Sequence, residues 1–239
     1  MAAVLADNRL SDEAKCALSD MGFKVISLPA AEELRPSPLA SHADIVIFRH
    51  KKTVITSKHY FEANRALFDA LRADYKATVL CDQGHRGADY PFDAALNALV
   101  IGNRIFCKTD TVSPLIIEYA KDAGLEIIHT KQGYPACTTL TISDNAAITA
   151  DEGMSKVLKK CGIRTYVISN SEKILLPPYE YGFIGGCGGA YGASLYFTGD
   201  IDSHPDAQAI KAAIREQGLE PTSLTSGALV DLGGLLFFE

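Results

Sequence analysis

Short apolar runs alternate along this chain with turn residues and with stretches of helical periodicity. The clearest unit spans residues 137–168, where the apolar run TTLTI reaches a turn at 143–145 and is followed by a second apolar run, AAIT. This spacing is typical of a β-hairpin. A helix is then predicted between Asp151 and Gly162, and the apolar run IRTYVI follows it. The unit therefore reads strand, strand, helix, strand.

The same order recurs along the chain, and five copies fit. Four hairpins are predicted, in the runs IVIFRHKKTVIT, ALVIGNRIFC, TLTISDNAAIT and AYGASLYFTG. The other predicted helices begin at Ser11, run from Tyr60 to Leu71, begin at Ser113, and run from Ser203 to Gln217. A doubly wound parallel α/β sheet is the alternative, but the hairpins and the lack of a GxGxxG motif disfavour it.

The first copy begins with the strand that returns from a hairpin, and the last copy ends with the missing partner of that strand. The two ends of the chain can therefore complete one shared unit, which favours a closed ring. We predict one domain over residues 1–239, an α/β fold in which ββαβ repeats form a five-bladed β/α-propeller closed by pairing of the N- and C-terminal strands.

Composition narrows the function classes. The 239 residues are 47% hydrophobic and 22% charged with a net charge of −6, and no basic cluster stands out beyond Lys51 and Lys52, so we expect no nucleic-acid partner. No run of eighteen apolar residues predicts a membrane span, and we expect a cytoplasmic protein. The six cysteines show no CxxC spacing, so reduced thiols and no metal are expected. Nothing implies an organic cofactor, and the residues give no indication of an oligomeric state.

Equivalent positions of a closed repeat converge at its axis, and one set of such positions carries polar residues. Asn97, Cys137, Gly188 and Asp44 each stand six residues before a tight turn, and Asp231 joins them by a looser match. This ring of residues is the predicted site.

The segments GYPACTTLTISDNAAITADEG, YGFIGGCGG and LVDLGG are similar to an uncharacterised bacterial family with a guanidine-modifying-enzyme fold, and the repeat resembles the pentein fold. Characterised penteins include arginine and agmatine deiminases, dimethylarginine hydrolases and amidinotransferases, and also a non-catalytic ribosome-subunit anti-association factor. The resemblance implies a carboxylate that holds a guanidinium group, a nucleophilic cysteine and a histidine. Here Asn97 stands at the carboxylate position, Asp231 stands at the cysteine position, and GYPAC and GGCGG contain no histidine.

Two cysteines are candidate nucleophiles. Cys187 lies among glycines, including Gly186 and Gly188, that let a ligand or another backbone approach closely. Cys137 lies on the predicted ring. The alternative for both is a small buried side chain. The remaining cysteines are expected to be packing residues, and Cys16 and Cys161 are expected to lie on helices with their side chains in the protein core.

Asp44 and Asp231 are the acidic members of the ring, and two carboxylates that face one cavity favour a cationic ligand. The alternatives are a turn cap for Asp44 and bonds from Asp231 to the amides of the following glycines. His204 is expected to cap a helix or face solvent, and His42 shows no metal-ligand spacing.

Two functional classes remain open. The first is an enzyme on guanidino compounds, a hydrolase or an amidinotransferase, with Cys187 or Cys137 as nucleophile, Asp231 as a catalytic carboxylate, and Asp44, Asn97, Gly186 and Gly188 around the ligand. The second is a non-catalytic protein that binds a small polar or cationic ligand at the axis, or a protein partner. Binding of a small ligand is the preferred interpretation, without a commitment to turnover.

Overall fold

The computed structural model describes residues 1–170 and 172–239. In this part of the chain the strands form five three-stranded sheets and one two-stranded sheet. In chain order the three-stranded sheets are β17–β1–β2 (Leu236–Phe238, Ala3–Asp7, Lys24–Leu28), β3–β4–β5 (Ile47–His50, Thr53–Ser57, Thr78–Asp82), β6–β7–β8 (Leu99–Ile101, Arg104–Cys107, Glu126–His129), β9–β10–β11 (Thr139–Ser143, Ala146–Thr149, Arg164–Val167) and β13–β14–β15 (Gly188–Tyr191, Ser194–Phe197, Glu220–Ser223). The two-stranded sheet pairs β12 (Ile174–Leu175) with β16 (Leu229–Val230) in parallel.

Every three-stranded sheet has the same pairing. The middle strand is antiparallel to the first strand and parallel to the third. The four predicted hairpins are confirmed as β3–β4, β6–β7, β9–β10 and β13–β14. A parallel pair needs a crossover, and helices supply it within each sheet. These helices are α1 (Asp12–Asp20), α3 (Lys58–Ala63), α4 (Arg65–Tyr75), α5 (Pro114–Asp122), α7 (Glu152–Lys160) and α8 (Ala207–Glu216), the last preceded by the turn η4 (Ile201–Ser203).

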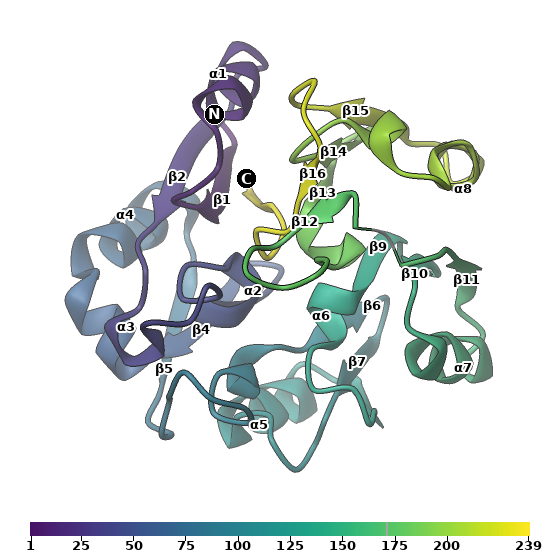
Figure 1. Cartoon of the computed structure of the whole chain (residues 1–239). Coiled ribbons are helices and arrows are strands. Elements are labelled where there is room, and N and C mark those ends of the chain that lie inside the picture. Colours follow the sequence, from purple (N-terminus) through teal and green to yellow (C-terminus); the bar gives the residue numbers. More distant parts are fainter. Residues whose placement is uncertain (171) are drawn as a thin grey trace.

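Figure 1 shows these crossover helices around the outside of the molecule. Side-chain caps start several of them, as the sequence predicts: Ser11 accepts a hydrogen bond from the amide of Ala14, and Asp151 accepts one from Met154. None of the helices in residues 1–170 and 172–239 has the length and apolar character needed to cross a membrane.

Two expectations about individual residues were wrong. The predicted helix from Tyr60 to Leu71 is interrupted at Asn64, whose side chain donates to the carbonyl of Tyr60 at 3.0 Å. Cys16 is exposed on α1. For His204 the expected alternatives were a helix cap or a solvent-facing side chain. It is buried, and its Nδ1 accepts from the amide of Asp206 at 3.0 Å just before α8, so the capping alternative is the one observed. A helix period alone cannot distinguish the edge of an apolar face from its centre, and the exposure of Cys16 is the result.

A short helical turn precedes the first strand of four sheets, and the sequence analysis did not foresee these turns. They are α2 (Ala43–Val46), η2 (Ala94–Leu96), α6 (Pro135–Thr138) and η3 (Ile184–Cys187). A further turn, η1 (Glu32–Leu34), lies between β2 and α2. Figure 1 places α2 and α6 near the middle of the molecule, with the C-terminal segment beside them.

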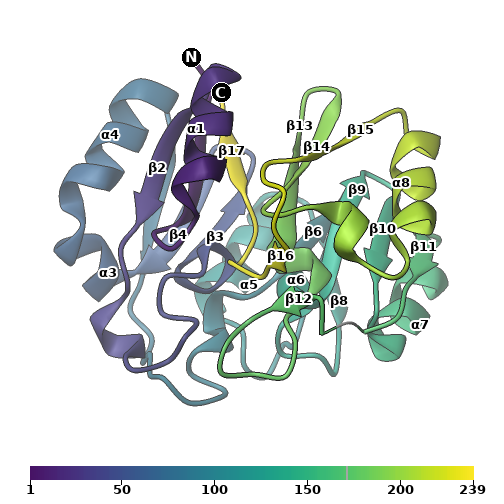
Figure 2. The same cartoon turned by 45° about the horizontal axis from the view of Figure 1, so that its top comes forward.

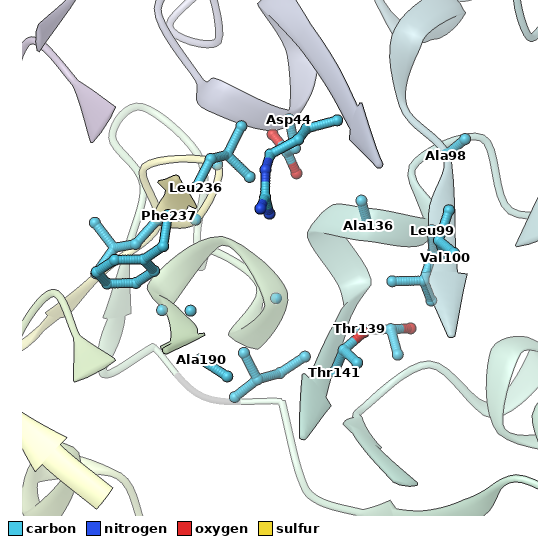
Figure 3. A pocket seen from close by; sticks show the side chains of 18 of the residues that line it. Asp44, Ala98, Leu99, Val100, Ala136, Thr139, Thr141, Ala190, Leu236 and Phe237 are labelled. Carbon is cyan, nitrogen blue, oxygen red and sulfur yellow. The ribbon is translucent and has the colours of Figure 1, made fainter. Parts of the chain in front are cut away.

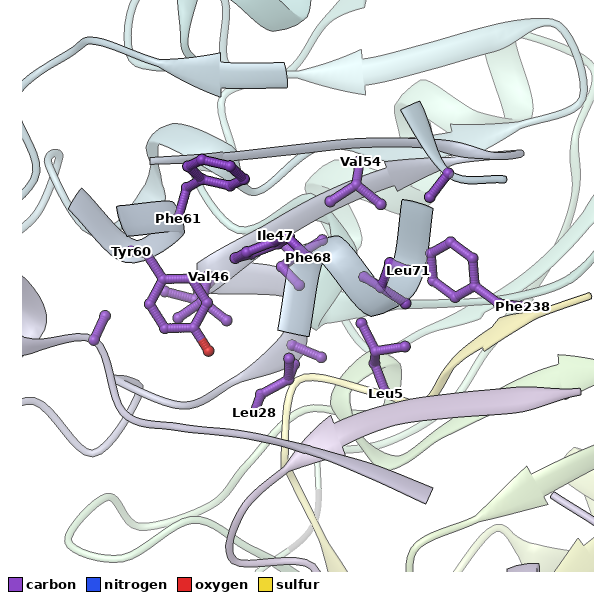
Figure 4. Packing of buried hydrophobic residues seen from close by; sticks show 14 of the residues in the cluster. Leu5, Leu28, Val46, Ile47, Val54, Tyr60, Phe61, Phe68, Leu71 and Phe238 are labelled. Atoms are coloured by element: carbon purple, nitrogen blue, oxygen red, sulfur yellow. The ribbon is translucent and has the colours of Figure 1, made fainter. Parts of the chain in front are cut away.

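The hydrophobic core is divided into clusters that each join two neighbouring sheets. One cluster, drawn in Figure 4, packs Leu5 of β1 and Phe238 of β17 with Val54 of β4 and Phe68 of α4. Other clusters join the second sheet to the third, the third to the fourth, and the fourth to the fifth. Burial of apolar surface therefore holds each sheet against the next.

The last cluster joins the fifth sheet to the first. Phe23, just before β2, lies 5.2 Å from the ring of Tyr191 in β13 and 5.6 Å from that of Tyr196 in β14. The ends of the chain also meet, because Ala3 of β1 pairs with Phe238 of β17. Figure 2 shows β17 alongside the first sheet, with the two termini close together.

Candidate functional site

The short turns bring four of the predicted ring residues together. Asn97, at the end of η2, is buried and uses its whole side-chain amide: Nδ2 donates to the backbone carbonyl of Asp44 at 3.1 Å and to Sγ of Cys137 at 3.2 Å, and Oδ1 accepts from the amide of Ala136 at 2.9 Å. Asn97 therefore ties α2 to α6. We call the region of Asp44, Asn97, Cys137 and Asp231 the hub.

Asp231 reaches the hub from the segment after β16. Its Oδ2 accepts from the amide of Phe183 at 2.8 Å, and its Oδ1 accepts from the amide of Gly233 at 3.2 Å. The bond to Gly233 was among those expected. Burial, with a smaller contribution from the charge of Asp44, raises the pKa of Asp231 from 3.8 to about 7. A side chain on Gly186 would overlap Oδ1 of Asp231, so this glycine makes room for the carboxylate.

Asp44 lies in α2 and is buried as well. Burial raises its pKa from 3.8 to about 6, against opposing effects of Cys137 and Asn97. The Cys137 thiol and the Asn97 amide lie close enough to Asp44 to lower its pKa, but neither carboxylate oxygen of Asp44 has a partner with hydrogen-bond geometry among the described residues. Buried polar atoms are normally paired, so unpaired ones point to an unfilled interaction. Both acidic groups of the hub are therefore buried at an energetic cost that a nearby cation would offset.

His42 belongs to this site, although the sequence analysis assigned it no role. Its Nδ1 lies 3.7 Å from Oδ1 of Asp231, and its Nε2 lies 4.0 Å from Oδ2 of Asp7 at the end of β1. Burial, partly offset by the charge of Asp7, lowers the pKa of His42 from 6.5 to about 4, so the ring is neutral at pH 7. His42 stands two positions before Asp44 and enters the same turn, which is the signal that could have revealed it.

The two candidate cysteines occupy different surroundings. Cys137 lies in α6 beside Asn97, and burial together with the charges of Asp44 and Asp231 raises the pKa of its thiol well above the usual range. Cys187 is fully buried in the apolar cluster between the fourth and fifth sheets, where its thiol donates to the carbonyl of Phe183. Burial raises the pKa of Cys187 too. Both thiols are therefore protonated at pH 7 in the free protein.

A cavity of about 390 Å³ opens on one side of the hub, and we call it the tyrosine-side cavity. His42, Cys137 and Asp231 line it, and Cys187 is not among its lining residues. The other lining residues come mostly from the segments that precede the hub turns: Leu39, Tyr134, Leu176, Tyr179, Glu180, Tyr181 and Phe183. A largely apolar wall with a few polar groups at one end is typical of a small-molecule site.

A second cavity, of about 450 Å³, is lined by the strands that follow the hub turns, and we call it the strand-side cavity. Asp44 and Gly188 line this one. Figure 3 looks into it, with Asp44 at one edge and Thr139 of β9 at another. The predicted ring is thus divided: Cys137 and Asp231 face one cavity, and Asp44 and Gly188 face the other. In residues 1–170 and 172–239, no three His, Cys, Asp or Glu side chains are grouped to hold a metal ion.

The repeated sheets give this chain a mixed α/β fold that matches solved structures with the pentein fold. The chain belongs to a family of unknown function, DUF6873, whose model matches residues 5–236. No curated protein sequence matches the chain significantly.

Several solved structures similar to this chain are enzymes. The chain is similar to SxtG, an amidinotransferase of the saxitoxin biosynthetic pathway from Microseira wollei, with a TM-score of 0.56 and 13% identity over 96% of this chain and 93% of that one. It is also similar to DDAH from Pseudomonas aeruginosa, complexed with citrulline, with a TM-score of 0.56 and 9% identity over 94% and 92% of the two chains. Agmatine deiminase from C. jejuni gives a TM-score of 0.56 and 9% identity over 95% and 90%. At these identities the likeness establishes the fold.

Proposed function

We propose that this chain is a closed five-bladed β/α-propeller whose tyrosine-side cavity binds a small cation of the guanidino or amino type. The closed ring is supported by the apolar cluster between the fifth and first sheets and by the pairing of β1 with β17. The ligand class is supported by the fold, since SxtG and agmatine deiminase are named for guanidino chemistry.

The observation that carries the proposal is the charge of the hub. Asp231 lines the tyrosine-side cavity, Asp44 lies behind it, and burial raises the pKa of both carboxyl groups. No lysine or arginine is among the lining residues of this cavity. A buried carboxylate without a cation is costly, and a bound cation offsets that cost. The neutral His42 at 3.7 Å from Asp231 adds no positive charge at pH 7.

Thermal unfolding tests this proposal directly. Agmatine and arginine, each at 100 times its Kd, are expected to stabilise the protein by about 2.7 kcal/mol, a rise in Tm of about 5–10 °C for a domain of this size. Citrulline, in which an uncharged ureido group replaces the guanidinium, is the matched neutral ligand and is expected to bind at least about tenfold more weakly. Equal shifts with citrulline and agmatine would refute the charge argument.

Variants localise the binding. Asp231→Asn is expected to weaken agmatine binding at least about tenfold, because it removes the charge that faces the cavity. Asp82→Asn is the matched control, since Asp82 is also buried and accepts two hydrogen bonds, from Ser113 and Gly84, at the end of β5 away from the tyrosine-side cavity. If no cation shifts the Tm of the wild type, the other interpretation stands, a module that binds a protein partner.

A second candidate function is turnover of the guanidino ligand, and the position of Cys137 favours it. Cys137, His42 and Asp231 line the same cavity, which combines a thiol, a base and a carboxylate. Burial, together with the charges of Asp44 and Asp231, raises the pKa of the Cys137 thiol, and a cation bound at Asp231 would lower it. Asp231 then holds the cation, and Cys137 rather than Cys187 attacks its central carbon.

Mass spectrometry of reaction mixtures tests turnover. Wild-type protein incubated with agmatine or arginine is expected to release ammonia and a ureido product, and Cys137→Ser is expected to abolish this. Cys187→Ala is the matched control, because Cys187 is an equally buried cysteine that does not line the tyrosine-side cavity. No product with the wild type would exclude turnover of these compounds and leave the binding proposal to be judged by the Tm shifts.

A further inference from the structure

The strand-side cavity is lined by several polar side chains with buried atoms that lack a hydrogen-bond partner among the described residues. It is lined by residues of β3, β6, β9, β13 and β17 and by the segment 233–235. Gly188, Gly189 and Ala190 of β13 contribute little side-chain volume to its wall. At about 450 Å³, the cavity lies within the range of about 300–1,000 Å³ that is usual for small-molecule sites.

Three polar side chains that line this cavity have buried atoms without a hydrogen-bond partner among the described residues. They are both carboxylate oxygens of Asp44, the Nε atom of Arg49 and the hydroxyl of Thr139. Arg49 is in β3 and stacks on the ring of Phe238, with 4.7 Å from its guanidinium carbon to the ring centroid. Thr139 is the first residue of β9. One cavity therefore presents a carboxyl group, a guanidinium group and a hydroxyl group, each with at least one polar atom that has no hydrogen-bond partner.

Unpaired buried charges of opposite sign in one cavity are costly unless something pairs with both. Burial lowers the pKa of Arg49 to about 10, against the opposing charge of Glu239, so the guanidinium remains charged at pH 7. A planar guanidinium suits a carboxylate, which it can bind through two parallel hydrogen bonds. The carboxylates of Asp44 and Asp144, which also line the cavity, would repel a doubly charged phosphate.

We propose that the strand-side cavity binds a small zwitterion of the amino-acid type. Arg49 and Thr139 hold the carboxylate of this ligand, and Asp44 receives its ammonium group. The site is separate from the tyrosine-side cavity, whose His42, Cys137 and Asp231 do not line it. The zwitterion proposal does not require the proposed function to be right, although the charge of Asp44 contributes to both.

Isothermal titration of the full chain at pH 7.5 tests the zwitterion. The probes are glycine, β-alanine and γ-aminobutyrate, with butyrate and butylamine as the two half-ligands. At least one zwitterion is expected to bind, and each half-ligand is expected to bind at least about tenfold more weakly, because it leaves one buried charge unpaired. Binding of butyrate or butylamine as tight as that of the zwitterion, or heat from none of the zwitterions, would overturn the proposal and leave a cavity filled by water alone.

Substitutions then show whether the zwitterion binds in the strand-side cavity. Arg49→Met keeps the stem over Phe238 and is expected to reduce affinity at least about tenfold, with Arg49→Lys reducing it less because the charge stays. Arg72→Met is the matched control, since Arg72 stacks on Phe61 at 5.0 Å on the outer helix α4 and lines neither cavity. Urea unfolding of each variant shows whether it is folded. An unchanged affinity of Arg49→Met for the zwitterion would refute the proposal.

Asp231→Asn separates this inference from the proposed function. It alters the tyrosine-side cavity, so agmatine binding is expected to weaken while the zwitterion still binds. If zwitterion binding is lost in Asp231→Asn but kept in Arg49→Met, the zwitterion occupies the tyrosine-side cavity, and the strand-side proposal is wrong while the proposed function is unaffected.

Discussion

Replacing Asp231 by asparagine is expected to make stability less sensitive to alkaline pH. In the folded protein the pKa of Asp231 is raised from 3.8 to about 7, mainly by burial. Between these two values the folded state binds a proton that the unfolded state has lost. The contribution of Asp231 to the free energy of unfolding therefore rises as pH falls from 8 toward 4, and asparagine has no such dependence.

The size of the effect follows from the shift. At pH 8 the buried carboxylate costs about 4 kcal/mol relative to an unperturbed aspartate, because each pKa unit corresponds to about 1.4 kcal/mol. At pH 5 the native carboxyl is protonated and the cost falls to about 2 kcal/mol. The stability difference between Asp231→Asn and wild type is thus expected to move by about 2–3 kcal/mol in favour of the variant between pH 5 and pH 8.

A second cost of the substitution does not depend on pH. The two carboxylate oxygens accept from the amides of Phe183 and Gly233, and an asparagine side chain has one oxygen, so one amide loses its acceptor. An unpaired buried amide costs about 1–3 kcal/mol. This cost lowers the free energy of unfolding of the variant by the same amount at every pH. The change with pH of the stability difference between variant and wild type therefore measures the effect of the buried charge.

Urea unfolding at pH 5, 6, 7 and 8 measures the difference. Thr198→Val is the control, because Thr198 is buried, donates to the carbonyl of Val230 at 2.6 Å and does not titrate. Its stability difference from wild type is expected to be the same at every pH. A difference for Asp231→Asn that is equally flat from pH 5 to pH 8 would refute the reasoning that a costly buried charge sits at the hub.

Three further outcomes follow from the hub. Gly186→Ala is expected to lower the free energy of unfolding by more than about 3 kcal/mol, since its methyl group would overlap Asp231. Gly227→Ala is expected to change it little, because a methyl group there would make only an ordinary van der Waals contact with the hydroxyl of Thr225; similar values for both would contradict the packing. Iodoacetamide at pH 7 is expected to modify the exposed Cys16 faster than the buried Cys137, and peptide mass spectrometry measures the order. The ¹³C shifts of the His42 ring are expected to stay those of neutral imidazole down to about pH 4, and a midpoint near 6.5 would show that the ring is not buried as described.

The pairing of strands could be predicted from the sequence because short turns leave few choices. Runs such as TLTISDNAAIT place two apolar segments around residues that favour turns, and β9 and β10 pair as expected. The strand β15 is harder to predict, because EPTS lacks apolar alternation and is placed by its parallel partner β14. Local pattern decides a hairpin, whereas tertiary packing decides such an edge strand.

The site was predicted only in part. Counting back from the turns grouped Asn97, Cys137 and Asp44, and a looser match added Asp231, because residues at equal distances from repeated turns reach equivalent places. The count could not show that Asp44 and Asp231 face different cavities, because that depends on which way each side chain leaves its turn. His42 was missed because its partners, Asp231 and Asp7, are remote in sequence.

The pairing of β1 with β17 has a consequence for synthesis of the chain. β1 (Ala3–Asp7) is synthesised long before its antiparallel neighbour β17 (Leu236–Phe238). Until β17 emerges, the nascent chain carries an open apolar strand edge, and such edges recruit wrong partners. Chaperone protection during that interval is expected to govern the yield of native protein.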